Sequence, residues 1–173
     1  MRNDFGAFLR FWILQGLTVF IVMLAPLSLW QSSSTSLNTT SLLGLGVFLL
    51  GLALETIADN QKSKFNKSNL TKSWIDVGVW RSSRHPNYLG EMMVWLGMYF
   101  FAFPSLVGKS ALIAFGSPLY VILLLVFVSG IPIVEKAADK KWGNDKNYQK
   151  YKKEVPVLIP TPTSILRTKL YHA

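Results

Sequence analysis

The sequence RHPNYLGE at residues 84–91 joins a basic, polar segment to an apolar run. Pro86 suits the first turn of a helix, because its missing N–H would have no intrahelical partner there. We expect Glu91 in that first turn, where a carboxylate complements the positive end of the helix dipole. Arg84 is a permanent cation and His85 titrates near neutrality, so this helix start is a candidate seat for an anion such as phosphate. The same pattern also suits a plain capped helix start with a snorkelling arginine.

Apolar runs separated by charged segments are typical of a polytopic membrane protein. Half of the 173 residues are hydrophobic, and the mean hydropathy is +0.31. About 20 apolar residues cross the hydrocarbon core, so we expect spans near residues 11–30, 41–58, 87–103 and 111–134. The sequence therefore predicts an all-α integral membrane bundle, a single domain over residues 1–173 with about four transmembrane helices and a cytoplasmic C-terminal helical tail.

Three prolines and one glutamate allow more detailed predictions within these apolar runs. Pro26 is expected to kink or end the first span one turn early, and Pro118 and Pro132 to break or bend the fourth. Glu55, near the end of the second span, faces protein or water, or already lies among the headgroups. The tail predicts one helix over residues 133–153.

The distribution of basic residues predicts the orientation. Residues 59–86 carry six Lys or Arg and residues 135–173 carry nine, whereas residues 31–40 carry none and residues 104–110 carry one. The positive-inside rule then makes both basic segments and both termini cytoplasmic, in a bacterial inner membrane or the endoplasmic reticulum. The basic excess reflects this topology, so the expected partner is the lipid bilayer, and no nucleic acid is expected.

Several kinds of site are excluded or unsupported. The chain has no cysteine, and His85 and His172 alone cannot form a zinc site, so no metal is expected. It has no GxGxxG or Walker pattern, and no acid or nucleophile can be tied to His85. The two cytoplasmic segments instead offer cations, flat rings and an amide, which suit a large anionic cofactor with a flat ring and a phosphate group, beside an apolar pocket for a lipophilic substrate. These residues are Lys62, Lys64, Arg81, Arg84, Trp80, Tyr88, Trp142 and Asn87.

Three separated motifs, in order, resemble the steroid 5-alpha-reductase C-terminal superfamily and the membrane proteins of unknown function allied to it. GVWRSS at residues 78–83 leads into RHPNYLGE, and ETIADNQKSKF at residues 55–65 is similar to the segment that precedes it in the family. Residues 117–160, from SPL to the final VLIP, resemble the last span and tail. The resemblance covers nearly the whole chain.

The resemblance implies one of two chemistries. Sterol and steroid reductases of the superfamily use NADPH to reduce a carbon–carbon double bond, whereas isoprenylcysteine and phospholipid methyltransferases use S-adenosylmethionine. Asn87 and Tyr88 with Glu91 resemble the reductase version. The methyltransferases carry a paired acid where this chain has Glu135 and then Lys136. We therefore expect an enzyme of lipid metabolism, an oxidoreductase acting on a CH–CH group of a steroid- or isoprenoid-like substrate.

Carried over by position, the resemblance implies a set of NADPH contacts but no catalytic acid. The first four match reductase residues that contact NADPH, and the last three would line the same pocket: Lys62, Trp80, Asn87, Tyr88, Arg84, His85 and Glu91. Asn66 and Lys67 stand where the sterol reductases have an Arg, which leaves NADPH and NADH both open.

Two alternatives remain beside the reductase. One is the S-adenosylmethionine-dependent methyltransferase, and the other is a non-catalytic membrane subunit or fragment. The second rests on a departure from the family, whose reductases carry further spans before the residue matching Phe5, with the groups that polarise the substrate. This chain is then a natural short form, a gene fragment or one part of a larger assembly. The substrate and oligomeric state stay open.

Overall fold

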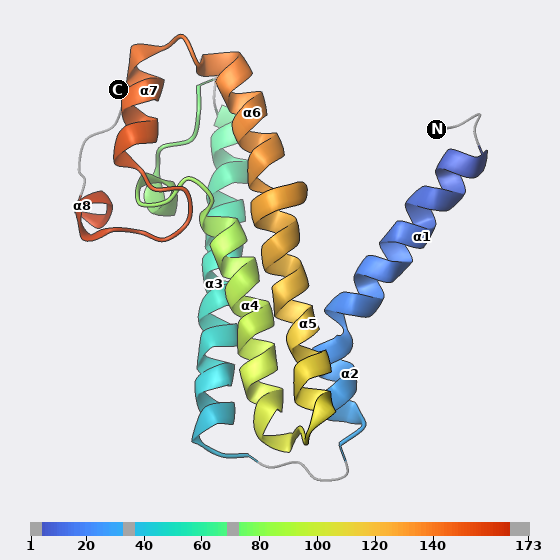
Figure 1. The fold of residues 1–173 in the computed structure, drawn as a ribbon. Coiled ribbons are helices and arrows are strands. Elements are labelled where there is room, and N and C mark those ends of the chain that lie inside the picture. Colours follow the sequence, from blue (N-terminus) through green and yellow to red (C-terminus); the bar gives the residue numbers. More distant parts are fainter. Residues whose placement is uncertain (1–4, 33–36, 69–72, 167–173) are drawn as a thin grey trace. The chain divides into compact units, whose positions relative to one another are not determined.

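The computed structural model describes residues 5–32, 37–68 and 73–166, and every regular element within them is a helix (Figure 1). The predicted all-α membrane-type fold is therefore confirmed. The chain forms two compact units, each built from two separate stretches. Unit 1 comprises Met1–Phe48 and Trp95–Ile122, and unit 2 comprises Leu49–Val94 and Leu123–Ala173.

Three helical stretches are long and apolar enough to cross a membrane: Phe5–Val22, Thr39–Ser68 and Lys109–Trp142. They correspond to the first, second and fourth expected spans. The third expected span, 87–103, corresponds to α4 (Pro86–Ala102), whose 17 residues make it shorter than the other three. The chain is therefore a membrane-type helical protein.

In unit 1, the first helix ends where Pro26 requires it to end. A single residue, Met23, separates α1 (Phe5–Val22) from α2 (Leu24–Trp30). Pro26 has no N–H to donate to the carbonyl of Val22, four residues earlier, and its ring would crowd that carbonyl. The Val22 carbonyl instead accepts a hydrogen bond from Ser117 Oγ at 2.7 Å. The expected early break at Pro26 is confirmed.

The longest helix, α3 (Thr39–Ser68), begins in unit 1 and ends in unit 2. Asn38 caps it, because Asn38 Oδ1 accepts hydrogen bonds from the backbone N–H groups of Thr40 and Ser41 at 2.9 and 3.2 Å. The helix continues ten residues beyond the expected span end at residue 58. The first part of the charged segment 59–86 is therefore helical.

Glycines bring α3 and α4 together within unit 2. A Cβ built on Gly51 would lie 2.7 Å from the carbonyl oxygen of Gly90, and one on Gly90 would lie 2.7 Å from the backbone N of Glu55. Only hydrogen fits between the two backbones at these positions, which explains Gly51 and Gly90.

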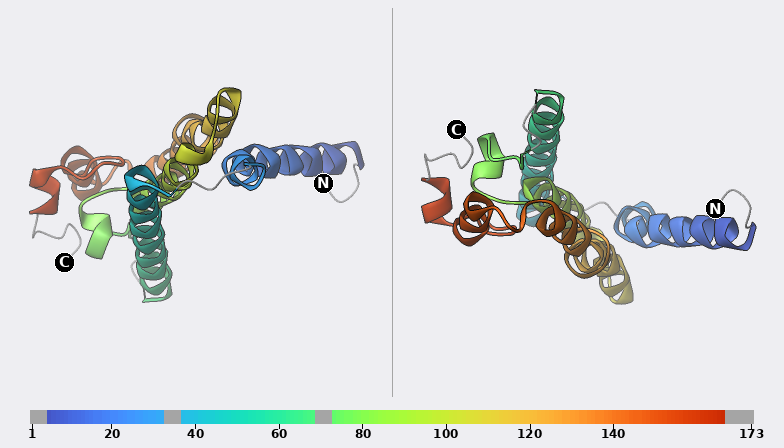
Figure 2. Two further views of the ribbon diagram at one scale, coloured as in Figure 1. Left: turned by 90° about the horizontal axis from the view of Figure 1, so that it is seen from below. Right: turned by 90° about the horizontal axis from the view of Figure 1, so that it is seen from above.

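Besides its parts of α3 and α4, unit 2 contains residues 73–85, which precede α4 and which we call the motif loop, and the C-terminal segments. Figure 2 shows the loop with η1 beside the C-terminal segments. Its further elements are η1 (Gly78–Arg81), the π-helical turn η3 (Leu124–Val128), α6 (Ile131–Trp142), α7 (Lys146–Glu154) and α8 (Pro162–Ile165).

The two prolines of the fourth span have different outcomes. Pro118 lies inside α5 (Lys109–Leu123) and does not end it. The interruption expected near Pro132 is present: it falls at η3 and Gly130, where Ser129 N donates to Leu124 O at 2.8 Å, and Pro132 takes a first-turn position of α6 that needs no N–H.

The tail is also two helices rather than the single one expected over residues 133–153. α6 ends at Trp142, before Gly143. Asp145 then caps α7 by accepting from the N–H groups of Asn147 and Tyr148 at 2.7 and 3.3 Å. The break lets the two tail helices take different directions within unit 2.

Candidate functional site

The C-terminal segment holds the loop that carries the motif. α4 begins at Pro86 as predicted, and just before it the backbone N–H of Arg84 donates to Pro156 O at 2.9 Å. The N–H of His85 donates to Val157 O at 3.1 Å. These two N–H groups are therefore engaged by the chain itself and are not part of an anion seat. Glu91 lies in the second turn of α4, so its predicted first-turn position is wrong.

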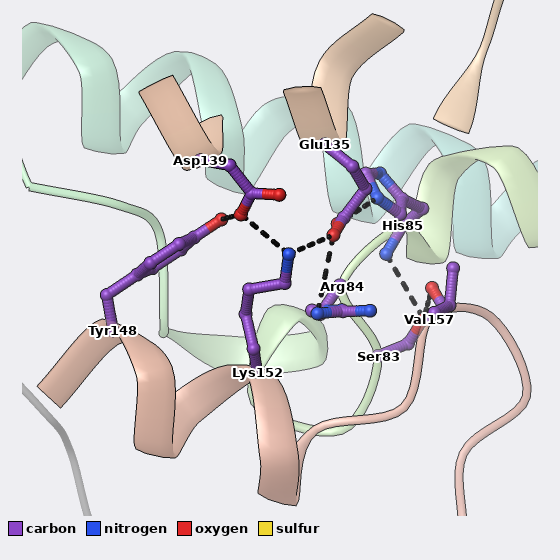
Figure 3. Close-up of polar contacts among 8 residues, drawn as sticks. All are labelled: Ser83, Arg84, His85, Glu135, Asp139, Tyr148, Lys152 and Val157. Carbon is purple, nitrogen blue, oxygen red and sulfur yellow. Dashed lines mark hydrogen bonds and ion pairs between the residues drawn. The ribbon is translucent and has the colours of Figure 1, made fainter. Parts of the chain in front are cut away.

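One carboxylate, Glu135 of α6, meets three cationic or titratable side chains (Figure 3). Glu135 Oε1 lies 2.8 Å from His85 Nε2, and Glu135 Oε2 lies 3.4 Å from Arg84 Nη1 and 3.1 Å from Lys152 Nζ. The Glu135 side chain is 19% exposed and that of His85 is 6% exposed. Glu135 thereby ties α7 to the motif loop.

Lys152 and Tyr148 extend this network along α7 to Asp139. Lys152 Nζ donates to Asp139 Oδ1 at 2.6 Å, and Tyr148 OH donates to the same oxygen at 3.3 Å. Burial lowers the pKa of Lys152, but hydrogen bonds to Asp139 and Glu135 outweigh it, so that pKa is raised. Burial, with the nearby charges of Glu135 and Asp139, raises the pKa of Tyr148 well above its usual value.

Aromatic rings form the wall behind this network. The ring of Trp74 lies 5.2 Å from that of Tyr148 and 6.1 Å from that of Tyr151, and all three side chains are buried. Trp142 lies edge-on to Trp74 at 6.2 Å. This cluster fixes α7 through burial of its apolar face.

A cavity of about 170 Å³ lies between the network and the aromatic wall, entirely within unit 2. Six of the seven predicted site residues line it: Lys62, Trp80, Arg84, His85, Asn87 and Tyr88. Other lining residues are Phe65, Trp74, Glu135, Trp142, Tyr148 and Tyr151. The seventh, Glu91, is not among the residues that line it, nor are Lys64 and Arg81.

The lining residues are held firmly by their neighbours. Trp80 Nε1 donates to Ala58 O at 2.9 Å, and Lys62 Nζ lies 5.4 Å from the centre of the Trp80 ring. The ring of Tyr88 stacks on that of His85, with ring centres 5.4 Å apart. The cavity walls are therefore preformed flat surfaces.

Some buried polar atoms of the cavity-lining residues have no hydrogen-bond partner among the described residues. They include Arg84 Nε, a donor, and Asn87 Oδ1, an acceptor. Asn87 Nδ2 does have a partner, since it donates to Asp59 Oδ1 at 3.2 Å. Buried polar atoms are normally satisfied, so this donor and acceptor are available to a bound molecule.

The sequence prediction missed cavity-lining residues in the tail and one, Trp74, in the segment before the motif. Trp74, Glu135, Tyr148 and Tyr151 line the cavity but were not predicted as site residues. The spacing of Tyr148, Tyr151 and Val155 is a signal for one buried face of a helix, and all three are buried. Trp74 has no local signal that distinguishes it from other interface tryptophans.

Residues 1–155 match the family described as a protein of unknown function (DUF1295), and the chain belongs to that family. The chain is also similar to an uncharacterized protein of Schizosaccharomyces pombe, with 25% identity over 126 residues. That match covers 62% of this chain and 36% of the yeast protein, so the chain spans well under half of that relative's length. No solved structure matches the chain.

Proposed function

We propose that the protein is a membrane-embedded reductase that uses NADPH or NADH to reduce a carbon–carbon double bond of a lipophilic, steroid- or isoprenoid-like substrate. The observation that carries this proposal is the cavity, which combines flat aromatic walls with two cations and two unsatisfied polar atoms. The motif resemblance favours the same cofactor, because Asn87, Tyr88 and Glu91 follow the reductase pattern.

The enclosed volume suits one ring of a dinucleotide. A space of about 170 Å³ accepts a carboxamide-bearing ring between the faces of Trp80, Tyr88 and Trp74, and the rest of the cofactor would extend from its mouth. Asn87 Oδ1 is an acceptor for a carboxamide N–H, and Arg84 Nε is a donor. Lys62 and Arg84 would supply positive charge for the phosphates.

The charge of the cavity favours a neutral or anionic ligand over a cationic one. Lys62 and Arg84 line it, and its lining carboxylate, Glu135, already faces Arg84, His85 and Lys152. The sulfonium of S-adenosylmethionine would gain little from a carboxylate so engaged and would lie near the positive charges of Lys62 and Arg84. This charge distribution favours our proposal of a reductase over a methyltransferase.

The protein's own residues would bind and orient the cofactor and the substrate. A reduced nicotinamide supplies the hydride when bound. Trp80 and Tyr88 would fix the plane of the ring, while Val134 and Ala138 line the cavity with apolar surface suited to a lipophilic substrate. The cluster around Glu135 would keep the motif loop in place, and the aromatic wall would limit the access of water.

A cytoplasmic position of the site accords with this cofactor. The two basic segments that form unit 2 are the ones that the positive-inside rule assigns to the cytoplasm, where nicotinamide cofactors are available. We propose both termini on that side as well.

Titration of the purified protein in detergent tests the proposal. Tryptophan emission is followed while NADPH, NADH and S-adenosylmethionine are added in separate experiments, because Trp74, Trp80 and Trp142 all line the cavity. Saturable quenching by a reduced nicotinamide cofactor is expected. Saturable binding of S-adenosylmethionine alone would assign the site to methyl transfer, and no binding of any of the three would support a non-catalytic membrane subunit.

A further inference from the structure

The helix that closes the cavity carries a row of lysines on its other face. Tyr148, Tyr151 and Val155 are buried, whereas Lys146, Lys150 and Lys153 are exposed at i, i+4 and i+7. This spacing places the three ammonium groups along one side of α7, opposite the aromatic face. We call Lys146, Lys150 and Lys153 the lysine row.

Acidic side chains of the described residues do little to neutralise the charge of the lysine row. Lys150 lies 3.8 Å from Glu154, an exposed pair that is weak in water. No ion pair to Lys146 or Lys153 occurs within residues 5–32, 37–68 and 73–166. Asp145, which precedes Lys146, is engaged as the N-cap of α7. Three adjacent cations on a solvated face repel one another, so an external anion would stabilise them.

Exposed apolar residues in the segments that flank α7 in sequence indicate which anion the lysine row binds. In the segment after α7, Ile159, Ile165 and Leu166 are 73%, 62% and 79% exposed. Before it, α6 presents Ile133 and Lys136 on the side away from the cavity-lining Val134 and Ala138. Exposed aliphatic side chains next to lysines are typical of surfaces at the boundary between headgroups and acyl chains. A soluble anion would leave these apolar groups in water.

We propose that the lysine row binds anionic phospholipid headgroups of the membrane in which the protein lies. The cluster directly follows an apolar stretch long enough to span that membrane, Lys109–Trp142. Juxtamembrane lysines are attracted to anionic lipid by about 1 kcal/mol each. Because the same helix presents Lys152 to Glu135 and its tyrosines to the cavity, lipid binding would hold the cavity wall in place. The proposal is independent of the reductase function.

Lipid retention by the full chain tests the proposal. The protein is reconstituted in nanodiscs of phosphatidylcholine with and without phosphatidylglycerol, and the lipid that stays bound after mild detergent extraction is quantified by mass spectrometry. The test variant is Lys146→Gln/Lys150→Gln/Lys153→Gln, in which glutamine preserves helix propensity. The matched control is Lys64→Gln/Lys67→Gln/Lys109→Gln, which removes the same charge from other exposed positions.

The parent and the control should retain phosphatidylglycerol in preference to phosphatidylcholine, and the test variant should bind it at least about tenfold more weakly. High salt should reduce the preference in the parent. Equal losses in the two triple variants would overturn the proposal, because net charge alone would then explain binding. Equal competition by soluble glycerophosphoglycerol would also overturn it in favour of a free phosphate ligand.

Discussion

His85 Nε2 lies 2.8 Å from Oε1 of Glu135, which follows it by fifty residues in the chain. The contact joins the motif loop to α6, and Glu135 Oε2 continues it to Lys152 on α7 at 3.1 Å. A single carboxylate therefore links three of the segments that line the cavity. We therefore expect this one side chain to contribute strongly to the stability of the site.

Glu135→Gln should destabilise the protein by about 2 to 4 kcal/mol, because Arg84 and Lys152 would then lie partly buried beside a neutral amide. Glu154→Gln, which removes an exposed carboxylate 3.8 Å from Lys150, is the control and should cost at most about 1 kcal/mol. Thermal unfolding in detergent, followed by tryptophan emission, measures both. Equal effects would show that Glu135 is not the organising residue.

The close approach of α3 and α4 predicts a different pair of outcomes. Gly51→Ala places a methyl group 2.7 Å from the carbonyl oxygen of Gly90, so we expect a loss of about 1 to 3 kcal/mol. Gly46→Ala meets no atom within 4 Å and should be neutral or slightly stabilising, since alanine favours helices. The thermal unfolding midpoints of the two variants in detergent test this predicted difference in stability. A tolerated Gly51→Ala would contradict the packing described.

The raised pKa of Tyr148 predicts an alkaline limit to stability. The folded state favours the protonated phenol, chiefly because it is buried and also because Glu135 and Asp139 are near. This contribution is complete below the unfolded tyrosine pKa of about 10 and is lost as the pH rises above it. The raised pKa of Lys152 acts in the same direction. Melting temperatures of the parent should therefore fall steeply above that pH.

Tyr148→Phe separates the tyrosine's part of this effect. The variant loses the hydrogen bond to Asp139 and should be less stable at neutral pH, but its stability should fall less steeply in alkali. Parallel curves for the two proteins would place the alkaline loss elsewhere.

The absence of cysteine makes the topology directly testable, because each introduced thiol is the only one in the chain. Leu37→Cys lies just before α3 and Asn144→Cys lies between α6 and α7, and both positions are exposed. A membrane-impermeant maleimide should label Leu37→Cys in intact cells and Asn144→Cys only after permeabilisation. Labelling of both in intact cells would reject the proposed orientation.

The sequence predicts the helices far better than it predicts their limits. The apolar runs and Pro26 predict α1 and α2, and Pro86 predicts the start of α4. The extension of α3 to Ser68 is missed because the expected span ends with the apolar run, although lysine and glutamine are good helix formers. The break at Gly143 is missed because glycine alone does not end a helix, and the start of a second helix at Asp145 depends on its capping hydrogen bonds.

The candidate site is likewise only partly predictable from the sequence. The motif residues that line the cavity follow from the resemblance, which compares positions near one another in sequence. The contribution of the tail depends on contacts between residues far apart, such as Arg84 N to Pro156 O and His85 to Glu135. No local pattern encodes such pairings. Glu91, although part of the motif, does not line the cavity; it lies on the same face of α4 as Asn87 but one turn further along the helix.

Comparison of NADPH binding by the parent and by Asn87→Ala/Tyr88→Ala tests the central claim most directly, with Asn144→Ala as a surface control. Asn87 and Tyr88 both line the cavity, and Asn87 offers its unsatisfied oxygen there. Calorimetric titration in detergent should give saturable binding to the parent and the control, and none to the double variant at an unchanged melting temperature. Equal binding by the double variant and the parent would show that this cavity is not the nicotinamide site.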